Sequence, residues 1–278
     1  MIRAFQEQDE PALLELLQRS LRFDTLTAPL LREKVHEDPG TTLVWEEDGL
    51  LGFCHGVPRG SIKLIAVAPE HRRRGIGSEL LQAVERALRA KKLRAIESVP
   101  NYLLPGLDVR YTEAIVFFEK HGYHKFGECY NLCCELTGRD FARPAPEGFE
   151  VRRATGEDRL VVMEFLQQHF APWQAEVEVM LSNRPISLHL AFSGPELLGF
   201  AGYDANNRGT GWFGPMGTSP EHRGAGLGGV LLARCLQDFQ AQGLERCTIP
   251  WVGPFRFYAR ACGAFIERVF WRYEKDLG

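Results

Sequence analysis

The sequence contains the same short segment twice. Residues 67–77 read VAPEHRRRGIG and residues 218–228 read TSPEHRGAGLG, so the second copy begins 151 positions after the first. An apolar run with helical periodicity follows each copy, SELLQAVERAL in the first and GVLLARCLQDF in the second. Two such similar strand-to-helix junctions indicate two copies of one domain. The 278 residues of the chain suit two domains of about 140 residues each.

The repeat extends to the segments around the junctions. Each half is expected to open with a short strand and a helix, at about residues 9–20 and 157–170, with acidic residues near the positive end of the helix dipole. A hairpin, the junction with its long helix, a short strand and an aromatic helix ending at glycine follow in both halves. YNLCCELT and VFWRYEKDL read as the last strand of the first and second half, respectively.

A linker separates the two halves. Pro144, Pro146 and Gly148 make continuous secondary structure unfavourable between them. We therefore expect a first domain at residues 1–140, a linker at 141–148 and a second domain at 149–278.

Composition and charge exclude several classes of protein. The net charge is −3 and neither half is strongly basic, which disfavours nucleic acid as a partner. No run of about 18 apolar residues is present, and the N-terminal segment has acids where a signal peptide needs a basic start, so we expect a cytoplasmic protein that does not bind a membrane. The seven cysteines lie mostly in apolar runs and form no C-x-x-C pair, so no metal site is expected.

The glycine-rich loops can be compared with three sequence motifs. A phosphate-binding P-loop is excluded because no Gly-Lys-Ser/Thr follows. The dinucleotide fingerprint G-x-G-x-x-G fits the second copy, but the first copy has Arg73 and Ser78 at two of the glycine positions, and the turn comes too late in the domain. Both copies share the pattern R-x-x-G-x-G, at residues 72–77 and 223–228.

The shared pattern suits a diphosphate. Glycines allow backbone N–H groups to approach phosphate oxygens, the helix start adds free donors and positive dipole charge, and arginine adds charge-assisted contacts. The alternative is a turn without a ligand, in which the arginines are only a solvated surface run.

This pattern, with the order of elements around it, resembles the GNAT superfamily of acetyl-CoA-dependent N-acetyltransferases, once in each half. The resemblance implies an α+β fold of two tandem GNAT-like domains, each a mixed, mostly antiparallel sheet flanked by helices. It also implies acetyl-CoA as co-substrate, with its diphosphate held by the two loops. The residues carried over are Arg72, Arg73, Arg74, Gly75, Gly77 and Ser78 in the first loop, and Arg223, Gly224, Ala225, Gly226, Gly228 and Gly229 in the second.

The resemblance places the thioester against the strand before each loop. Backbone N–H groups there polarise the acetyl carbonyl, as an oxyanion hole does. The matching positions are Ile65 to Val67 and Met216 to Thr218. Pro215 indicates either a bulge in the second of these strands or a strand that begins only after it.

A tyrosine on the later aromatic helix often protonates the leaving thiolate in this family. Tyr258 occupies that position in the second half, whereas the first half has Phe118, which has no proton to donate. Catalysis is therefore expected mainly in the second half, with Tyr111 or water as a substitute donor in the first. For the general base, Glu97 is the carboxylate candidate of the first half, and Asp204 and His189 are possible in the second.

The resemblance implies transfer of an acetyl group to a primary amine, by direct attack in a ternary complex. The acceptor is expected to be a small molecule or a peptide, selected by residues 20–40 and 170–187. The alternative function is an acyl-CoA-binding regulatory module with degenerate catalysis. The tandem domains are expected either as a monomer with an internal pseudo-dimer or as a homodimer.

Overall fold

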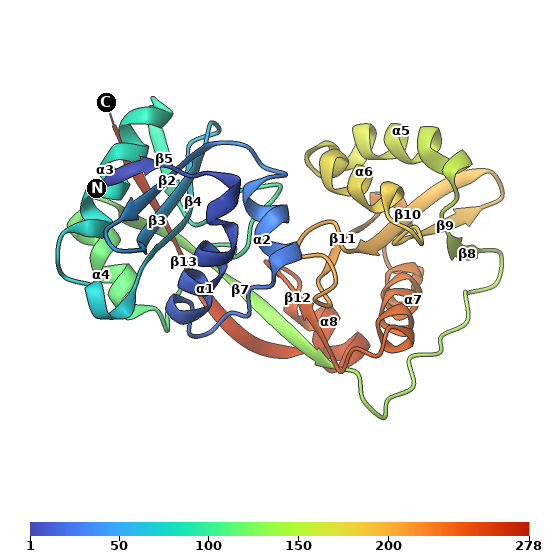
Figure 1. Cartoon of the computed structure of the whole chain (residues 1–278). Helices are drawn as coiled ribbons and strands as arrows, with labels where there is room; N and C mark the ends of the chain where they lie inside the picture. The colour runs from blue at the N-terminus through green and yellow to red at the C-terminus, as the bar shows by residue number, and fades with distance from the viewer. Residues whose placement is uncertain (278) are drawn as a thin grey trace. The chain divides into compact units, whose positions relative to one another are not determined.

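The structure, a computed structural model, describes residues 1–277 and contains two compact units (Figure 1). The first unit consists of Met1–Cys129 together with the C-terminal segment from Val269 onward, and the second of Tyr130–Arg268. These units differ from the contiguous domains expected from the sequence. The difference lies in the last strand of each half, as described below.

The first unit is a sheet with the order β1-β2-β3-β4-β5-β13, antiparallel except between β4 and β5. The long helix α3 packs on β3, where Gly52 and Gly56 have no side chains and Leu80 and Val84 take their place. Its elements are β1 Ile2–Ala4, α1 Glu10–Ser20, α2 Ala28–Val35, β2 Thr41–Glu46, β3 Leu50–Val57, β4 Ser61–Val67, α3 Ile76–Leu88, β5 Lys92–Ala95, β6 Leu107–Asp108, α4 Thr112–Lys120 and the first part of β7 His124–Glu135.

The second unit repeats this order of elements. Strands β11-β10-β9-β8 form an antiparallel sheet. The side of β11 at Gly217 is covered by the ring of Phe170, while Met216 meets α7 at Gly228. The elements are the end of β7, β8 Glu150–Arg153, α5 Arg159–His169, α6 Gln174–Ser182, β9 Leu188–Ser193, β10 Glu196–Tyr203, β11 Phe213–Thr218, α7 Leu227–Ala241, β12 Arg246–Ile249, α8 Phe255–Cys262 and the first part of β13 Phe265–Asp276.

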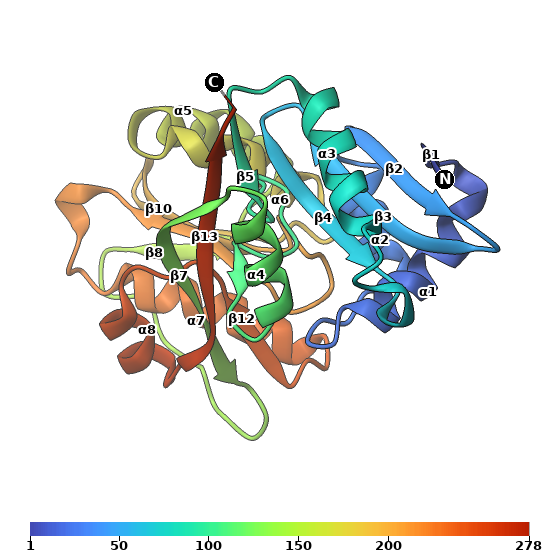
Figure 2. The ribbon, with the colours of Figure 1, turned by 90° about the vertical axis from the view of Figure 1, so that its left-hand side faces the viewer.

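The two units exchange their last strands. The end of β13 pairs with β5 of the first unit, with Tyr273 opposite Ala95 and Asp276 opposite Lys92. The end of β7 pairs instead with β12 of the second unit. Figure 2 shows β13 running through the first unit beside β5. The expectations that YNLCCELT closes the first half and VFWRYEKDL the second are therefore wrong, because the segment from Tyr130 belongs to the second unit and the segment from Val269 to the first.

Side chains of β13 fix this pairing. Phe270 and Tyr273 are fully buried, and the Tyr273 hydroxyl donates a hydrogen bond to Glu119 at 2.7 Å. Lys275 makes an ion pair with Glu85 of α3 at 2.8 Å. The exchanged strand is thus part of the core of the first unit.

Candidate functional site

Strand β4 is paired on one side only along most of its length. It pairs with β3 throughout, but with β5 only at Ser61 and Ile62. The N–H of Ala68 donates to Leu51, and in an antiparallel ladder the direction of the N–H groups alternates. The N–H groups of Ile65 and Val67 therefore point to the side that β5 has left. The assignment of these two N–H groups to the acetyl carbonyl stays a prediction.

Strand β11 has the same arrangement in the second unit. Within the described residues, the backbone pairing on its β12 side consists of the bridge between Trp212, just before β11, and Thr248. Because the N–H of Ser219 donates to Leu198 at 2.7 Å, the N–H groups of Met216 and Thr218 point away from β10.

An irregularity in the pairing of β11 lies just before these donors. Ala201 pairs with Met216 and Tyr203 with Phe213, so β11 contains one residue more than its partner between these positions. Pro215 lies in this interval and has no N–H to pair. Of the two alternatives for Pro215, a bulge within the strand and a strand that begins after it, the structure confirms the bulge.

The first glycine loop leads directly into α3. Gly75 caps the helix with a φ of 90°, a left-handed conformation that glycine adopts without strain. A Cβ on Gly77 would lie 3.3 Å from both Phe117 and Val67, so the loop approaches β4 closely. The N–H groups of Gly77 and Ser78 belong to the first helical turn, which leaves donors free for an anion.

The three arginines of this loop have different surroundings. The guanidinium of Arg72 donates to the carbonyl oxygen of Val67 at 3.2 Å and to the carboxylate of Glu113 at 2.8 Å. Arg73 and Arg74 are exposed, and Arg74 bonds His71 at 2.7 Å. Arg72 therefore joins the loop to the open side of β4, and Arg73 and Arg74 are the arginines exposed at the helix start.

The second loop has the same backbone. Gly224 and Gly226 have φ angles of 91° and 85°, and Gly226 caps α7. A Cβ on Gly228 would lie 3.4 Å from Met216 and 3.5 Å from Phe257, which repeats the close approach seen in the first unit. Arg223 is exposed and Ala225 partly buried.

Gly229 has a different role from the one carried over to it. Its N–H donates to the carbonyl oxygen of Gly226 at 3.1 Å, so it is not a free donor. The position of its missing side chain is occupied by the guanidinium of Arg143, a linker residue that the sequence analysis did not select. No local pattern could have found Arg143, because 86 positions separate it from Gly229.

Tyr258 lies on α8 inside the core of the second unit. Its ring packs edge-on against Phe213 and Phe257, with centroids 6.1 and 4.9 Å away. Burial raises the pKa of the Tyr258 phenol above its ordinary value, which keeps the group protonated. In the first unit Phe118 is fully buried on α4, and Tyr111, the proposed substitute donor, donates to Asp24 at 2.7 Å.

Glu97 is not placed as a general base. Both of its carboxylate oxygens accept from the guanidinium of Arg272, at 2.7 and 2.8 Å. A bidentate pair of this kind neutralises the carboxylate and occupies its lone pairs. Glu97 thus joins β13 to the first unit, and this geometry corrects the expectation of a catalytic role.

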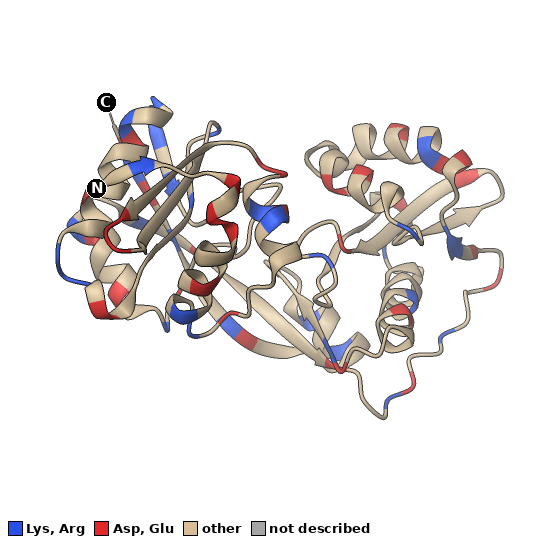
Figure 3. Ribbon diagram, viewed as in Figure 1, with Lys and Arg blue, Asp and Glu red and all other residues tan. Residues whose placement is uncertain are grey.

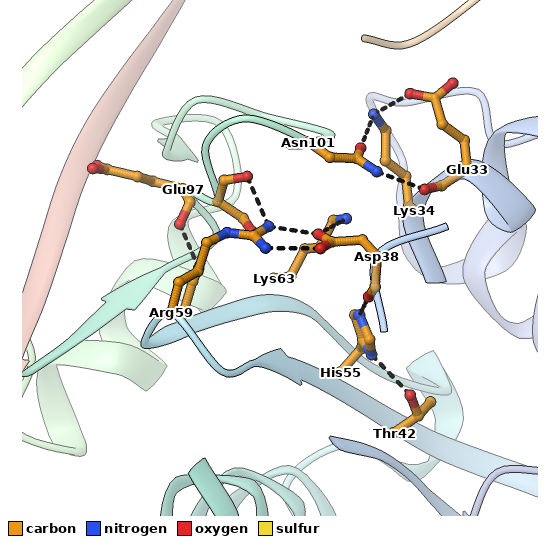
Figure 4. A network of polar contacts seen from close by, with 11 residues as sticks. Glu33, Lys34, Asp38, Thr42, His55, Arg59, Lys63, Glu97 and Asn101 are labelled. Atoms are coloured by element: carbon orange, nitrogen blue, oxygen red, sulfur yellow. Dashed lines mark hydrogen bonds and ion pairs between the residues drawn. The ribbon is translucent and has the colours of Figure 1, made fainter. Parts of the chain in front are cut away.

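Glu97 borders a buried polar network at the start of β4 (Figure 4). Asp38 accepts from Arg59 and from Lys63, the residue at a bulge in β4. Burial lowers the pKa of Lys63 to about 8 and that of His55 to about 4, so His55 is neutral at physiological pH. These groups satisfy one another, which fixes β4 where β5 separates from it.

The second unit holds a buried carboxylate that the sequence analysis missed. Glu176 on α6 is 9% exposed, and its carboxyl group makes no hydrogen bond or ion pair with any of residues 1–277. Burial raises its pKa to about 7. The two candidates named for this half are engaged: His189 bonds Asp238 at 2.7 Å, and Asp204 accepts from the N–H of Gly209 at 3.0 Å.

Charged side chains of both signs occur in each unit. Figure 3 shows Lys and Arg interspersed with Asp and Glu in each unit. Within residues 1–277, no group of three or more His, Cys, Asp or Glu side chains has an arrangement suited to a metal ion. The helices in that range are also too short or too polar to cross a bilayer.

Comparison with known proteins gives the same family for both halves. Residues 38–125 match the model of the acetyltransferase (GNAT) domain, and residues 154–264 match that of the acetyltransferase (GNAT) family. A search of curated proteins found no match.

Solved structures resemble the whole chain at low sequence identity. The glucosamine N-acetyltransferase region of a fungal multi-domain β-N-acetylglucosaminidase has a TM-score of 0.81 at 16% identity over 99% of this chain, which spans only 38% of that protein. A GCN5-related N-acetyltransferase from Sphaerobacter thermophilus has a TM-score of 0.76 at 19% identity, over 99% of this chain and 95% of that one. A tandem GNAT protein from the clavulanic acid biosynthesis pathway has a TM-score of 0.73 at 17% identity, over 100% and 98% of the two chains. Two matched domains, with the same loop and the same half-paired strand in each unit, show that this chain belongs to the GNAT acetyltransferases, as a tandem two-domain member.

Proposed function

We propose that this protein transfers an acetyl group from acetyl-CoA to a primary amine, and that the second unit does the chemistry. The observation that carries the proposal is a combination found in the second unit alone. The unpaired N–H groups of Met216 and Thr218, the glycine loop of α7 and a protonated Tyr258 occur there together. The first unit has the strand and the loop, but Phe118 replaces the tyrosine.

The reaction assigns one task to each of these groups. The amine nitrogen attacks the thioester carbonyl, and the developing oxyanion is stabilised by the N–H groups of Met216 and Thr218. The C–N bond forms, the nitrogen releases one N–H proton to solvent, and the C–S bond breaks as the phenol of Tyr258 gives its proton to the departing thiolate. Tyr258 regains a proton from solvent after the products leave.

The attacking amine must first lose a proton. Glu176 is the carboxylate of the second unit whose pKa of about 7 suits this task, because it is half ionised near neutral pH. It lies one helical turn from Trp173, whose ring stacks on Phe170, and Phe170 covers Gly217 of β11. The contacts of Trp173 with Phe170 and of Phe170 with Gly217 join the start of α6 to the strand that carries the N–H donors.

The acceptor is proposed to be a small-molecule or peptide amine, and the protein to act in the cytoplasm. Amino sugars are the first acceptors to test, because one structural neighbour is a glucosamine N-acetyltransferase region. A second candidate function is an acyl-CoA-binding regulatory module, which the absence of a tyrosine at Phe118 favours for the first unit.

The test is calorimetric titration of coenzyme A, followed by an assay of thiol release with acetyl-CoA and a panel of amines. Saturable binding with acceptor-dependent thiol release supports the enzyme. Binding without release for every acceptor class supports the regulatory module, and no binding by folded protein contradicts both proposals.

A further inference from the structure

The two coenzyme loops differ in the positive charge that they carry. The first reads RRRGIG, with three consecutive arginines, whereas the second reads RGAGLG and keeps only Arg223. The backbone is the same in both, with a left-handed glycine capping a long helix. If both loops serve a diphosphate, the second lacks two of the cations that the first one has.

The linker brings another arginine to the second loop. Arg143 lies against Gly229, the third residue of α7. A Cβ on Gly229 would be 3.3 Å from the Cζ atom of Arg143 and would clash with the Nη1 atom of Arg143. Pro146 passes the cap of the same helix, 3.8 Å from the Cβ position of Gly226. Phe141, which is 8% exposed, and Phe149 hold the two ends of this segment in the core of the unit.

The guanidinium of Arg143 is exposed and lies beside the positive end of the α7 dipole, so an anion bound at this helix start would contact both. The first turn of a helix carries partial positive charge, which repels a guanidinium. Arg143 makes no ion pair or side-chain hydrogen bond with any residue in the described range 1–277. Arg139, four positions earlier, is by contrast fully engaged, because it donates to the carbonyl oxygen of Cys262 at 2.6 Å. The family to which the chain belongs places a diphosphate at this helix start, and that anion would bridge Arg143 and the helix.

We propose that Arg143 is a ligand of the coenzyme diphosphate in the second unit. The linker supplies this guanidinium in place of the arginines that the second loop lacks, and Gly229 provides the space in which it lies. This proposal rests on the proposed function, since it needs the second loop to bind coenzyme A.

The experiment compares the affinity for coenzyme A of the wild type, Arg143→Ala, Gly229→Ala and the double variant. A charge-assisted contact predicts an affinity loss of about 10- to 100-fold in Arg143→Ala. Gly229→Ala is expected to give a similar loss, because its methyl group displaces the guanidinium. Gly229 has no positive φ, and alanine favours a helix, so this variant should remain folded. The double variant should be no weaker than either single one, since both remove the same contact.

Two controls distinguish the possible failures. Arg86→Ala removes an exposed arginine on α3 and should leave the affinity unchanged. Pantetheine, which lacks the diphosphate, should bind the wild type and Arg143→Ala equally. If the wild type binds no coenzyme A, the proposed function fails. If the wild type binds and Arg143→Ala binds equally well, the role of Arg143 is refuted while the proposed function stands. Additive losses in the double variant would also refute it.

Discussion

Replacing Glu176 by glutamine is expected to make the protein more stable and less active. The pKa of Glu176 is raised from 4.5 to about 7 by burial alone. The folded state therefore binds a proton more tightly than the unfolded state, and stability falls as the pH rises from about 4.5 to about 7. At pH 8 the raised pKa of Glu176 lowers the free energy of unfolding by about 3 kcal/mol. Glutamine never ionises, so the Glu176→Gln variant does not have this loss of stability.

Urea unfolding at pH 5 and pH 8 measures this effect. Glu176→Gln should exceed the wild type by about 2 to 3 kcal/mol at pH 8 and by less than about 1 kcal/mol at pH 5. Glu178→Gln is the matched control, because Glu178 lies on the same helix and is paired with Arg159. Glu178→Gln should show no increase in the free energy of unfolding, relative to the wild type, between pH 5 and pH 8. Equal stability differences at the two pH values would refute the argument that Glu176 is buried without a partner.

The same variant tests the assignment of Glu176 as the base. The rate of a wild-type enzyme with this base should rise with pH through about 7, as the carboxylate forms. Glu176→Gln should lower kcat/KM by about 100-fold or more and abolish this rise. A stabilised variant with full activity would leave the stability argument standing but remove Glu176 from the mechanism.

Three further substitutions separate catalytic from structural roles. Tyr258→Phe should lower turnover by about 100- to 10,000-fold with coenzyme A affinity within tenfold of the wild type; unchanged turnover would remove Tyr258 as the proton donor. Glu97→Gln should retain full turnover in a kinetic assay yet cost about 2 kcal/mol in urea unfolding, because Arg272 loses its charged partner. Phe270→Ala should cost about 3 to 5 kcal/mol and speed hydrogen exchange in β5 rather than β12, while Phe239→Ala on α7 should do the reverse. Faster exchange in β12 on loss of Phe270 would argue against the exchanged strand.

Features set by neighbouring residues were predictable from the sequence. The loop glycines need left-handed backbone at Gly75 and Gly226, and only local chemistry decides that. Pro215 limited β11 to two alternatives, a bulge or a late start, because a residue without an N–H cannot pair, and the structure has the bulge. The donors at Met216 and Thr218 then follow from the strict alternation of an antiparallel strand.

Features set by distant residues were not predictable in this way. The alternating pattern of β13 suits β5 and β12 equally well, so nothing local in it specifies the partner. An acid at the start of a helix usually faces solvent, and the environment of Glu176 depends instead on tertiary packing. Arg143 lies in a proline-rich linker whose composition indicates only a flexible connection.

The exchange of strands gives the first half of the sequence a structural role in the second unit. Leu132, Cys134 and Leu136 are buried in the core of the second unit, yet all three precede the linker in the sequence. The side chain of Asn131 accepts a hydrogen bond from the N–H of Trp251 at 3.1 Å, just beyond β12. A second half cut at the linker would thus lose a strand beside β12 and part of its core. Because the first half supplies that strand, its contribution to the fold of the second unit does not depend on whether Phe118 or a tyrosine stands on α4.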